Sequence, residues 1–226
     1  MFIGHFGVAF GSKKIVPKVS LGTLILAAQL LDLVWPILLS LGVEHVRIDP
    51  GNTAFTPLEF YDYPITHSLL MVILWSLLFG GVYYGIKRQV KGAIVAGCAV
   101  LSHWVLDFLT HRPDLPLFPW GGPYAGLGLW NSVPGTIVVE WAIFIAGVVL
   151  YATSTRPLDR TGRYAFWGLV AFLIVSAVAA NFGPPPPDVK AIAVTALFLW
   201  LLVPWGYWID RHRQSAAVRQ DNPAKA

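Results

Sequence analysis

Six stretches of this chain are apolar enough and long enough to cross a lipid bilayer as helices. The hydrocarbon core takes roughly 20 helical residues, and the stretches cover residues 19–41, 66–86, 91–110, 132–153, 164–182 and 189–209. Of the 226 residues, 56% are hydrophobic and only 12% are charged, which excludes an ordinary soluble domain. Because lipid cannot satisfy backbone polar groups, such segments fold as helices. We therefore predict an all-α, polytopic transmembrane helical bundle with about six spanning helices. It forms a single integral membrane domain over residues 1–213, followed by a polar, disordered tail over 214–226.

Basic residues gather in alternate connections between these stretches. They precede the first stretch, follow the second and the fourth, and close the chain: Lys13, Lys14, Lys18, Lys87, Arg88, Lys91, Arg156, Arg160, Arg163, Arg211, Arg213 and Arg219. Since loops rich in Lys and Arg usually stay in the cytoplasm, we expect both termini to be cytoplasmic. The loops 42–65, 110–131 and 183–188 then face outward. The net charge of +4 follows from this arrangement and does not indicate nucleic-acid binding.

Four ionisable residues interrupt the apolar stretches, namely Asp32, His103, Asp107 and Glu140, and His67 lies at the edge of another stretch. An acidic side chain near the middle of a spanning helix costs about 2.5 to 3.5 kcal/mol on insertion scales. Such residues therefore tend to face a cavity, a partner or an ion. A hydrogen-bonded polar pair that holds two helices together is the structural alternative. Because several such groups come from separate stretches, we interpret them as a functional site.

The positions of these residues along their helices place them in one layer of the membrane. His103 and Asp107 are four residues apart, so they share a helical face and can bind one ion together. At about 1.5 Å of rise per residue, His103 and Asp32 lie roughly 18 and 20 Å above the cytoplasmic ends of their helices. Asp107 and Glu140 lie at roughly 24 Å, and His67 lies higher, near 30 Å.

His5 reaches this layer only if the N-terminal segment enters the membrane. Residues 1–12 are too short to cross the bilayer alone, but a re-entrant or interfacial helix that turns at Lys13 and Lys14 is tolerated where protein surrounds it. Such a helix places the ring of His5 roughly 12 Å above the inner surface, a little below the other polar groups.

The side chains in this layer offer imidazole nitrogen and carboxylate oxygen, with no thiolate nearby. This combination favours a divalent metal, zinc above all, with manganese or iron as alternatives. The set can hold one catalytic ion with an open position, or two ions bridged by a carboxylate. Either arrangement activates water near neutral pH. Glu140 is then the candidate catalytic residue, as a general base or as a carboxylate behind the metal ligands.

Four short motifs resemble those of the predicted membrane-bound metal-dependent hydrolases of bacteria. They are Gly4-His5-Phe6-Gly7, Asp32 late in the first stretch, Thr66-His67-Ser68 and His103-x-x-x-Asp107, and the resemblance covers roughly residues 1–150. It implies a hydrolytic activity in the bacterial inner membrane, with His5, Asp32, His67, His103 and Asp107 as metal ligands. The chain departs from the family at two points. No second acid follows Asp32, and Tyr63-Pro64-Ile65 stands where the family often has an Arg-Gly pair.

The outer loops at 42–65 and 110–131 are rich in proline, glycine and aromatic residues. They can fold over the polar layer as a lid, which an amphiphile entering from the outer leaflet would meet first. We therefore expect membrane lipids as partners and a lipid-like ester or phosphoester as the substrate. Among the remaining residues, we expect His111 in an interfacial loop, His45 and His212 in solvent, and Cys98 as a small buried side chain.

Two alternatives belong to other functional classes. An acid and histidine layer also suits a cation or proton transporter, and a non-catalytic membrane protein can use the same groups as a structural polar core. Transporters often show inverted repeats with broken helices at matching positions, and no such repeat is evident here. The oligomeric state does not follow from the sequence.

Overall fold

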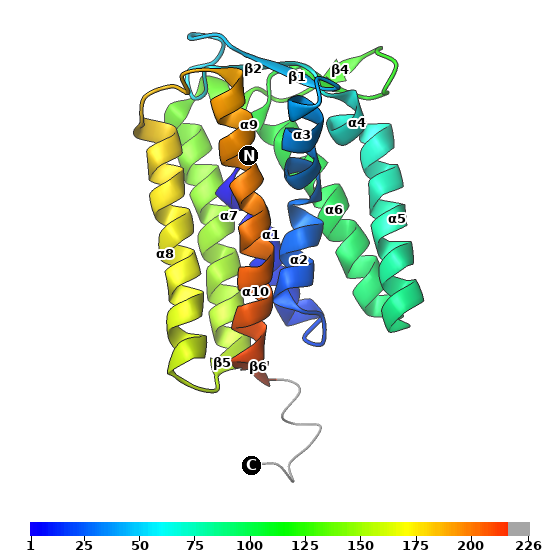
Figure 1. Ribbon diagram of the computed structural model, residues 1–226, viewed down its shortest axis with the longest axis vertical. Coiled ribbons are helices and arrows are strands. Elements are labelled where there is room, and N and C mark those ends of the chain that lie inside the picture. The colour runs from blue at the N-terminus through cyan, green and yellow to red at the C-terminus, as the bar shows by residue number, and fades with distance from the viewer. Residues whose placement is uncertain (217–226) are drawn as a thin grey trace.

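The computed structural model describes residues 1–216 and consists mostly of helices that run side by side (Figure 1). The helices are α1 (Ile3–Ile15), α2 (Leu21–Ala28), α3 (Leu30–Ser40), α4 (Pro64–His67), α5 (Leu69–Lys87), α6 (Val90–Thr110), η1 (Leu129–Asn131), α7 (Val133–Ser154), α8 (Arg160–Phe182), α9 (Val189–Leu197), η2 (Phe198–Leu201) and α10 (Leu202–Arg211). Among the described residues, five spans are long and apolar enough to cross a membrane, with α9, η2 and α10 forming one of them, and the bent pair α2–α3 makes a sixth. The predicted fold class is confirmed.

The first predicted span is broken rather than continuous. We expected one helix over 19–41, whereas α2 and α3 meet at an angle of 56°. The break falls at Gln29, whose backbone leaves the helical region with φ −104° and ψ 5°. The last carbonyls of a helix have no partner within that helix. The carbonyl of Ala28, at the end of α2, is therefore free to accept a hydrogen bond from another element.

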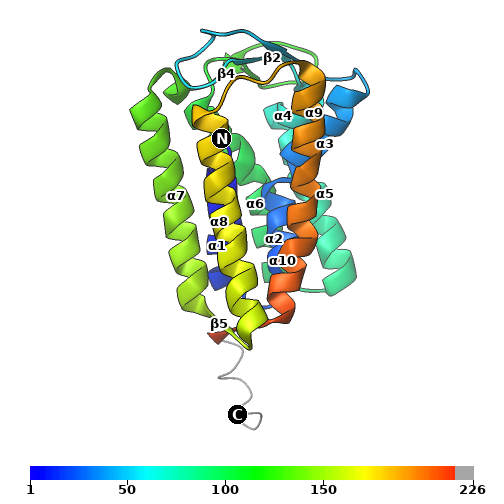
Figure 2. The same cartoon turned by 60° about the vertical axis from the view of Figure 1, so that its left-hand side comes forward.

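Helix α1 lies inside the bundle, packed against α2, α6 and α7 (Figures 1 and 2). It is the expected short N-terminal helix, although it continues past Lys13 and Lys14 to Ile15. Two glycines allow α1 and α7 to approach closely. A Cβ atom on Gly7 would lie 2.5 Å from the carbonyl oxygen of Ile143, and one on Gly147 would lie 2.1 Å from that of Gly7. This contact holds α1 at the centre of the molecule.

Short strands cover one end of the bundle. Strands β1 (His45–Ile48) and β2 (Leu58–Asp62) form an antiparallel pair in which Arg47 faces Glu59, and β3 (Leu115–Pro116) pairs with β4 (Tyr124–Ala125). β1, β2 and β4 lie together across this end in Figure 1, and β2 and β4 do so in Figure 2 as well. We call these strands and their loops the cap. A cluster of buried apolar side chains, which includes Trp35 of α3 and Trp104 of α6, joins the cap to the helices below it.

The opposite end carries a third antiparallel pair, β5 (Thr155–Pro157) with β6 (Arg213–Ser215). Gln214 and Ser215 therefore lie in a strand, although we expected them in the tail. Residues 217–226 of that predicted tail lie outside the described residues.

Helices on the outside of the bundle expose apolar side chains, as lipid contact requires. In α5, only Val72 and Tyr83 are buried. Cys98 of α6 is also exposed, which corrects our expectation of a buried side chain. Its neighbour Gly97 instead faces α5, where a Cβ atom would lie 3.0 Å from the carbonyl oxygen of Ser76. The apolar sequence around Cys98 reflects contact with lipid as well as with protein.

Candidate metal centre

The five residues predicted as metal ligands lie together inside the bundle. They form two overlapping groups, His5 with His103 and Asp107, and Asp32 with His67 and His103, each with ligand atoms within 4.8 Å of one another. His5 comes from α1, Asp32 from the first turn of α3, His67 from the end of α4, and the remaining two from α6. We call these five residues the His/Asp cluster.

Distances within the cluster place its ring nitrogens against its carboxylates. Nε2 of His103 lies 3.3 Å from Oδ2 of Asp107 and 3.5 Å from Oδ1 of Asp32. Nε2 of His67 lies 3.7 Å from each of the same two oxygens. On the other side of Asp107, Oδ1 lies 3.2 Å from Nε2 of His5. Oδ1 of Asp107 therefore faces the nitrogen of His5, whereas Oδ2 faces those of His67 and His103.

His5 corrects one of our expectations about depth. Its ring stacks on that of His103, with centroids 3.7 Å apart and planes 2° from parallel. The two ring centres are therefore closer than the roughly 6 Å difference in depth that the sequence predicted for them. The difference arises because α1 is held inside the bundle by α7, so its depth is not set by a turn at the membrane surface.

Burial in the cluster is nearly complete. The exposed fractions of His5, His67, His103 and Asp107 range from 0% to 5%, whereas the side chain of Asp32 is 24% exposed. Asp32 is therefore the most exposed residue of the cluster.

The hydrogen bond of His103 defines which of its nitrogens is free. Nδ1 lies 2.8 Å from the carbonyl oxygen of Ala28. Because a carbonyl only accepts, Nδ1 carries the proton and a neutral ring has its lone pair on Nε2. That Nε2 and both ring nitrogens of His5 are buried without a hydrogen-bond partner among the described residues. Buried polar atoms are normally paired, so unpaired imidazole nitrogens facing carboxylates fit a metal ion such as zinc.

Glu140 belongs to neither group of candidate ligands. One of its oxygens, Oε1, accepts hydrogen bonds from the backbone N–H groups of Phe2 and Gly4, at the start of α1. The same region brings the α-amino group of Met1 to 2.6 Å from Oδ1 of Asp107. Glu140 thus contacts the helix that carries His5, and its predicted catalytic role stays a prediction.

The cap contains a polar group whose burial the sequence did not predict. His111, expected in an interfacial loop, is only 3% exposed and packs against Trp130 at 4.1 Å between ring centroids. Its Nδ1 lies 2.9 Å from Oδ1 of Asp114, and the hydroxyl of Tyr63 contacts both. Burial lowers the pKa of His111 below its ordinary value, and the nearby Asp114 opposes this effect. His45 and His212 are partly exposed and pair with Asp62 and Asp159.

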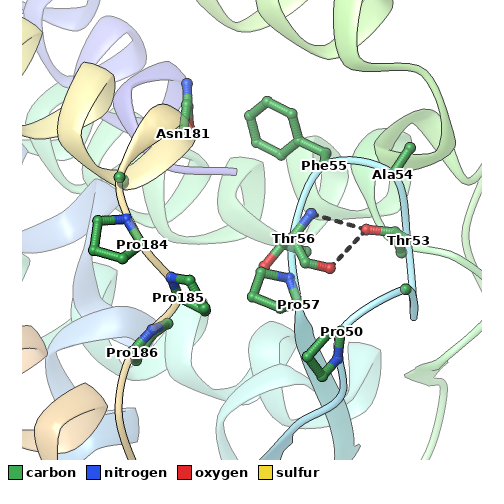
Figure 3. A pocket seen from close by; sticks show the side chains of 13 residues that line it. Pro50, Thr53, Ala54, Phe55, Thr56, Pro57, Asn181, Pro184, Pro185 and Pro186 are labelled. Carbon is green, nitrogen blue, oxygen red and sulfur yellow. Dashed lines mark hydrogen bonds between the residues drawn. The ribbon is translucent and has the colours of Figure 1, made fainter.

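A pocket of about 290 Å³ opens at the capped end, away from the cluster. It lies between residues 50–57 and residues 180–186, and Phe55, Asn181 and five prolines line it together with Thr53 and Thr56 (Figure 3). The two threonines hydrogen-bond across the loop at 3.0 Å. No residue of the His/Asp cluster lines this pocket, so it is not an entrance to the candidate metal centre.

Comparison with known proteins places the chain in a family. Comparisons with curated proteins and with solved structures find no match. Residues 6–184 match the family model described as YdjM inner membrane protein. This segment contains Asp32, His67, His103 and Asp107, and His5 lies one residue before it. The description states a location and no activity. Because the match spans most of a chain with several membrane-crossing helices, this protein belongs to the YdjM family of inner membrane proteins.

Proposed function

We propose that this protein is an integral-membrane, metal-dependent hydrolase that acts on a lipid-like ester or phosphoester. The observation that carries the proposal is the convergence of three imidazoles and two carboxylates in one buried cluster, where Nε2 of His103 has no hydrogen-bond partner among the described residues. Zinc is the favoured ion because the cluster offers nitrogen and oxygen ligands and no thiolate. A bound divalent ion supplies Lewis acidity that activates water at neutral pH.

The chain's own residues define what such a site can do. His103 offers a single lone pair on Nε2 and belongs to both groups of ligands. We therefore propose one ion for each chain, held by His103 with Asp107 and members of either group. Asp32 is the cluster residue that a substrate can approach, since it is the most exposed. The contacts of Glu140 support a role in holding α1 rather than in proton transfer.

The membrane setting supports an amphiphilic substrate. The cluster is surrounded by helices whose outer faces are apolar, and Leu77, Leu78 and Ile86 of α5 are all more than half exposed. In this proposal, the polar part of a lipid reaches Asp32 while its acyl chains stay in the bilayer. The transporter alternative has less support, because broken spans in such proteins usually occur in matching pairs. Within residues 1–216, one helix pair is bent by more than 40° at a short break.

Metal content tests the proposal directly. The full chain is purified in mild detergent, exposed to zinc, dialysed and analysed for zinc per polypeptide. We expect about one equivalent in the native protein and little in His103→Ala or Asp107→Asn. His212→Ala is the matched control, because it removes a histidine that lies outside the cluster. Native protein that retains no zinc would overturn the metal-centre proposal.

Hydrolysis is measured on the same samples. Fluorogenic phosphodiester and carboxylic ester lipids are presented in mixed micelles, and we expect turnover of one class that depends on zinc and is lost in His103→Ala. A protein that binds zinc but hydrolyses neither class would be a metal-binding membrane protein rather than the proposed hydrolase.

A further inference from the structure

Glu44 is a buried acid that the sequence places in an outer loop. It lies between α3 and β1, where a charged side chain normally stays in water, yet it is 0% exposed. Its Oε1 accepts hydrogen bonds from the backbone N–H groups of Ile65 and Thr66, both at 2.8 Å. Its Oε2 accepts a third from the hydroxyl of Thr66 at 2.7 Å. Glu44 is thus tied to the residue that precedes His67 of the cluster.

The hydroxyl of Thr66 connects Glu44 to the ring of His67. Oγ1 of Thr66 lies 2.6 Å from Nδ1 of His67, and Thr66 is itself fully buried. A hydroxyl has one proton to donate, and a carboxylate can only accept. Because the proton of Thr66 goes to Glu44, its oxygen must accept from His67. Nδ1 of His67 therefore carries the proton, and a neutral ring has its lone pair on Nε2.

The direction of the hydrogen bond from His67 to Thr66 matters because it leaves Nε2 of His67 unprotonated. This nitrogen faces the candidate metal centre, 3.7 Å from Asp32 and from Asp107. The carbonyl of Ala28 acts on His103 in the same way. Partners behind metal-binding histidines commonly set the tautomer and ring orientation, and their loss typically weakens metal affinity 10- to 100-fold. The oxygen of Thr66 in α4 and the carbonyl oxygen of Ala28 in α2 thus leave the lone pair on Nε2 in both His67 and His103.

We propose that Glu44 is a positioning residue of this site, which acts through Thr66 to hold His67 in the tautomer that a metal requires. The proposal rests on the metal-binding function proposed above. A purely structural reading assigns Glu44 only to the first N–H groups of α4. That role needs the two bonds to Oε1, but it does not depend on the direction of the proton between Thr66 and His67.

Glu44→Gln separates these two roles. The glutamine has nearly the same shape, and its carbonyl oxygen can still accept from Ile65 and Thr66. Its NH₂ group takes the place of Oε2 and donates to the hydroxyl of Thr66. The hydroxyl is then free to donate to Nδ1 of His67, which places the ring proton on Nε2. A protonated Nε2 cannot bind a metal.

The first readout is the tautomer of His67 in metal-free protein. Full-length protein labelled with ¹⁵N-histidine is studied by NMR in detergent at pH ~8, where an ordinary imidazole is neutral, and the His67 signals are identified from their loss in His67→Gln. We expect a protonated Nδ1 in the native protein and in Thr66→Ser, and a protonated Nε2 in Glu44→Gln. An unchanged tautomer in Glu44→Gln would overturn the proposal.

The second readout is zinc affinity, measured by competition with a chromogenic chelator. We expect Glu44→Gln and Thr66→Val to bind zinc roughly 10- to 100-fold more weakly than the native protein, and Thr66→Ser to bind nearly as well. Glu59→Gln is the matched control, because Glu59 pairs with Arg47 and Arg112 on the cap. If Glu44→Gln fails to fold, Thr66→Val carries the test, and native affinity in that variant would refute the proposed role.

The two readouts distinguish failure of this inference from failure of the proposed function. Native protein that binds no zinc, but in which Glu44→Gln reverses the tautomer, would overturn the metal site while supporting the control of His67 by Glu44. Native protein that binds zinc with an affinity indifferent to Glu44 would leave the metal site in place and refute the positioning role.

Discussion

His103 is the residue on which both halves of the cluster depend. It belongs to both groups of candidate ligands, stacks on His5 and lies against both carboxylates. The spacing of His103 from Asp107 predicted that the two share a helical face. The hydrogen bond from His103 to Ala28 could not be predicted, because that carbonyl is available only where α2 ends.

Glu140 gives a prediction at the same scale. In Glu140→Ala, the N–H groups of Phe2 and Gly4 lose their acceptor, and leaving a buried group such as that of Gly4 unpaired costs about 1–3 kcal/mol. We expect a lower thermal midpoint and weaker zinc binding, because the start of α1 carries His5. Both are measured in detergent.

Glu140→Gln is the companion variant, since its amide oxygen still accepts from α1. We expect it to keep nearly native stability and hydrolysis. Loss of hydrolysis in a stable Glu140→Gln protein would instead support the general-base role that the sequence suggested for Glu140.

At the scale of elements, α1 is the helix that completes the site. It brings His5 against His103, and it is held there by close contact with α7 and by Lys13, which pairs with Asp210 of α10 at 2.9 Å. A short helix gains little stability from its own hydrogen bonds. Its position therefore depends on packing against the longer helices around it.

Gly147→Ala tests this dependence. The added Cβ atom would lie 2.1 Å from the backbone oxygen of Gly7, so α1 and α7 must separate. Overpacking of this kind costs about 1–3 kcal/mol, and we expect both a lower thermal midpoint and weaker zinc binding as His5 moves.

The control for this variant is Gly81→Ala in α5, where a Cβ atom meets nothing within 4 Å. Since alanine favours helix more than glycine does, this change is expected to be neutral or slightly stabilising. Equal behaviour of the two variants would show that the contact between α1 and α7 does not hold the site.

At the scale of the whole molecule, the cap and the basic loops lie at opposite ends. The β1–β2 pair covers one end, while the C-terminal end of α5 and the β5–β6 pair lie toward the other (Figure 1). The distribution of Lys and Arg predicts that the capped end faces outward. The orientation decides from which leaflet a lipid would reach Asp32.

Cysteine labelling tests the orientation. In a Cys98→Ser background, a single cysteine is placed at Asp49 on the cap or at Lys87 at the other end, both exposed positions. We expect a membrane-impermeant maleimide to label Asp49→Cys in intact spheroplasts, and Lys87→Cys only after the membrane is broken. The reverse pattern would place the basic loops outside.

The sequence by itself determined which segments cross the membrane and which polar residues they carry. Both depend on local quantities, since the length of an apolar run sets a span and the cost of burying a charge singles out residues such as Asp107. The spacing of His103 and Asp107 is equally local.

The tertiary structure alone decided how these residues meet. The break at Gln29, the level of His5, and the burial of Glu44 and His111 all depend on contacts between segments far apart in the chain. The sequence alone predicts that Glu44 is a solvated acid in a loop. The structure buries it because Thr66, 22 residues later, folds against it. Such contacts depend on packing and on the direction of each hydrogen bond, and neither is recorded in the pattern of residue types.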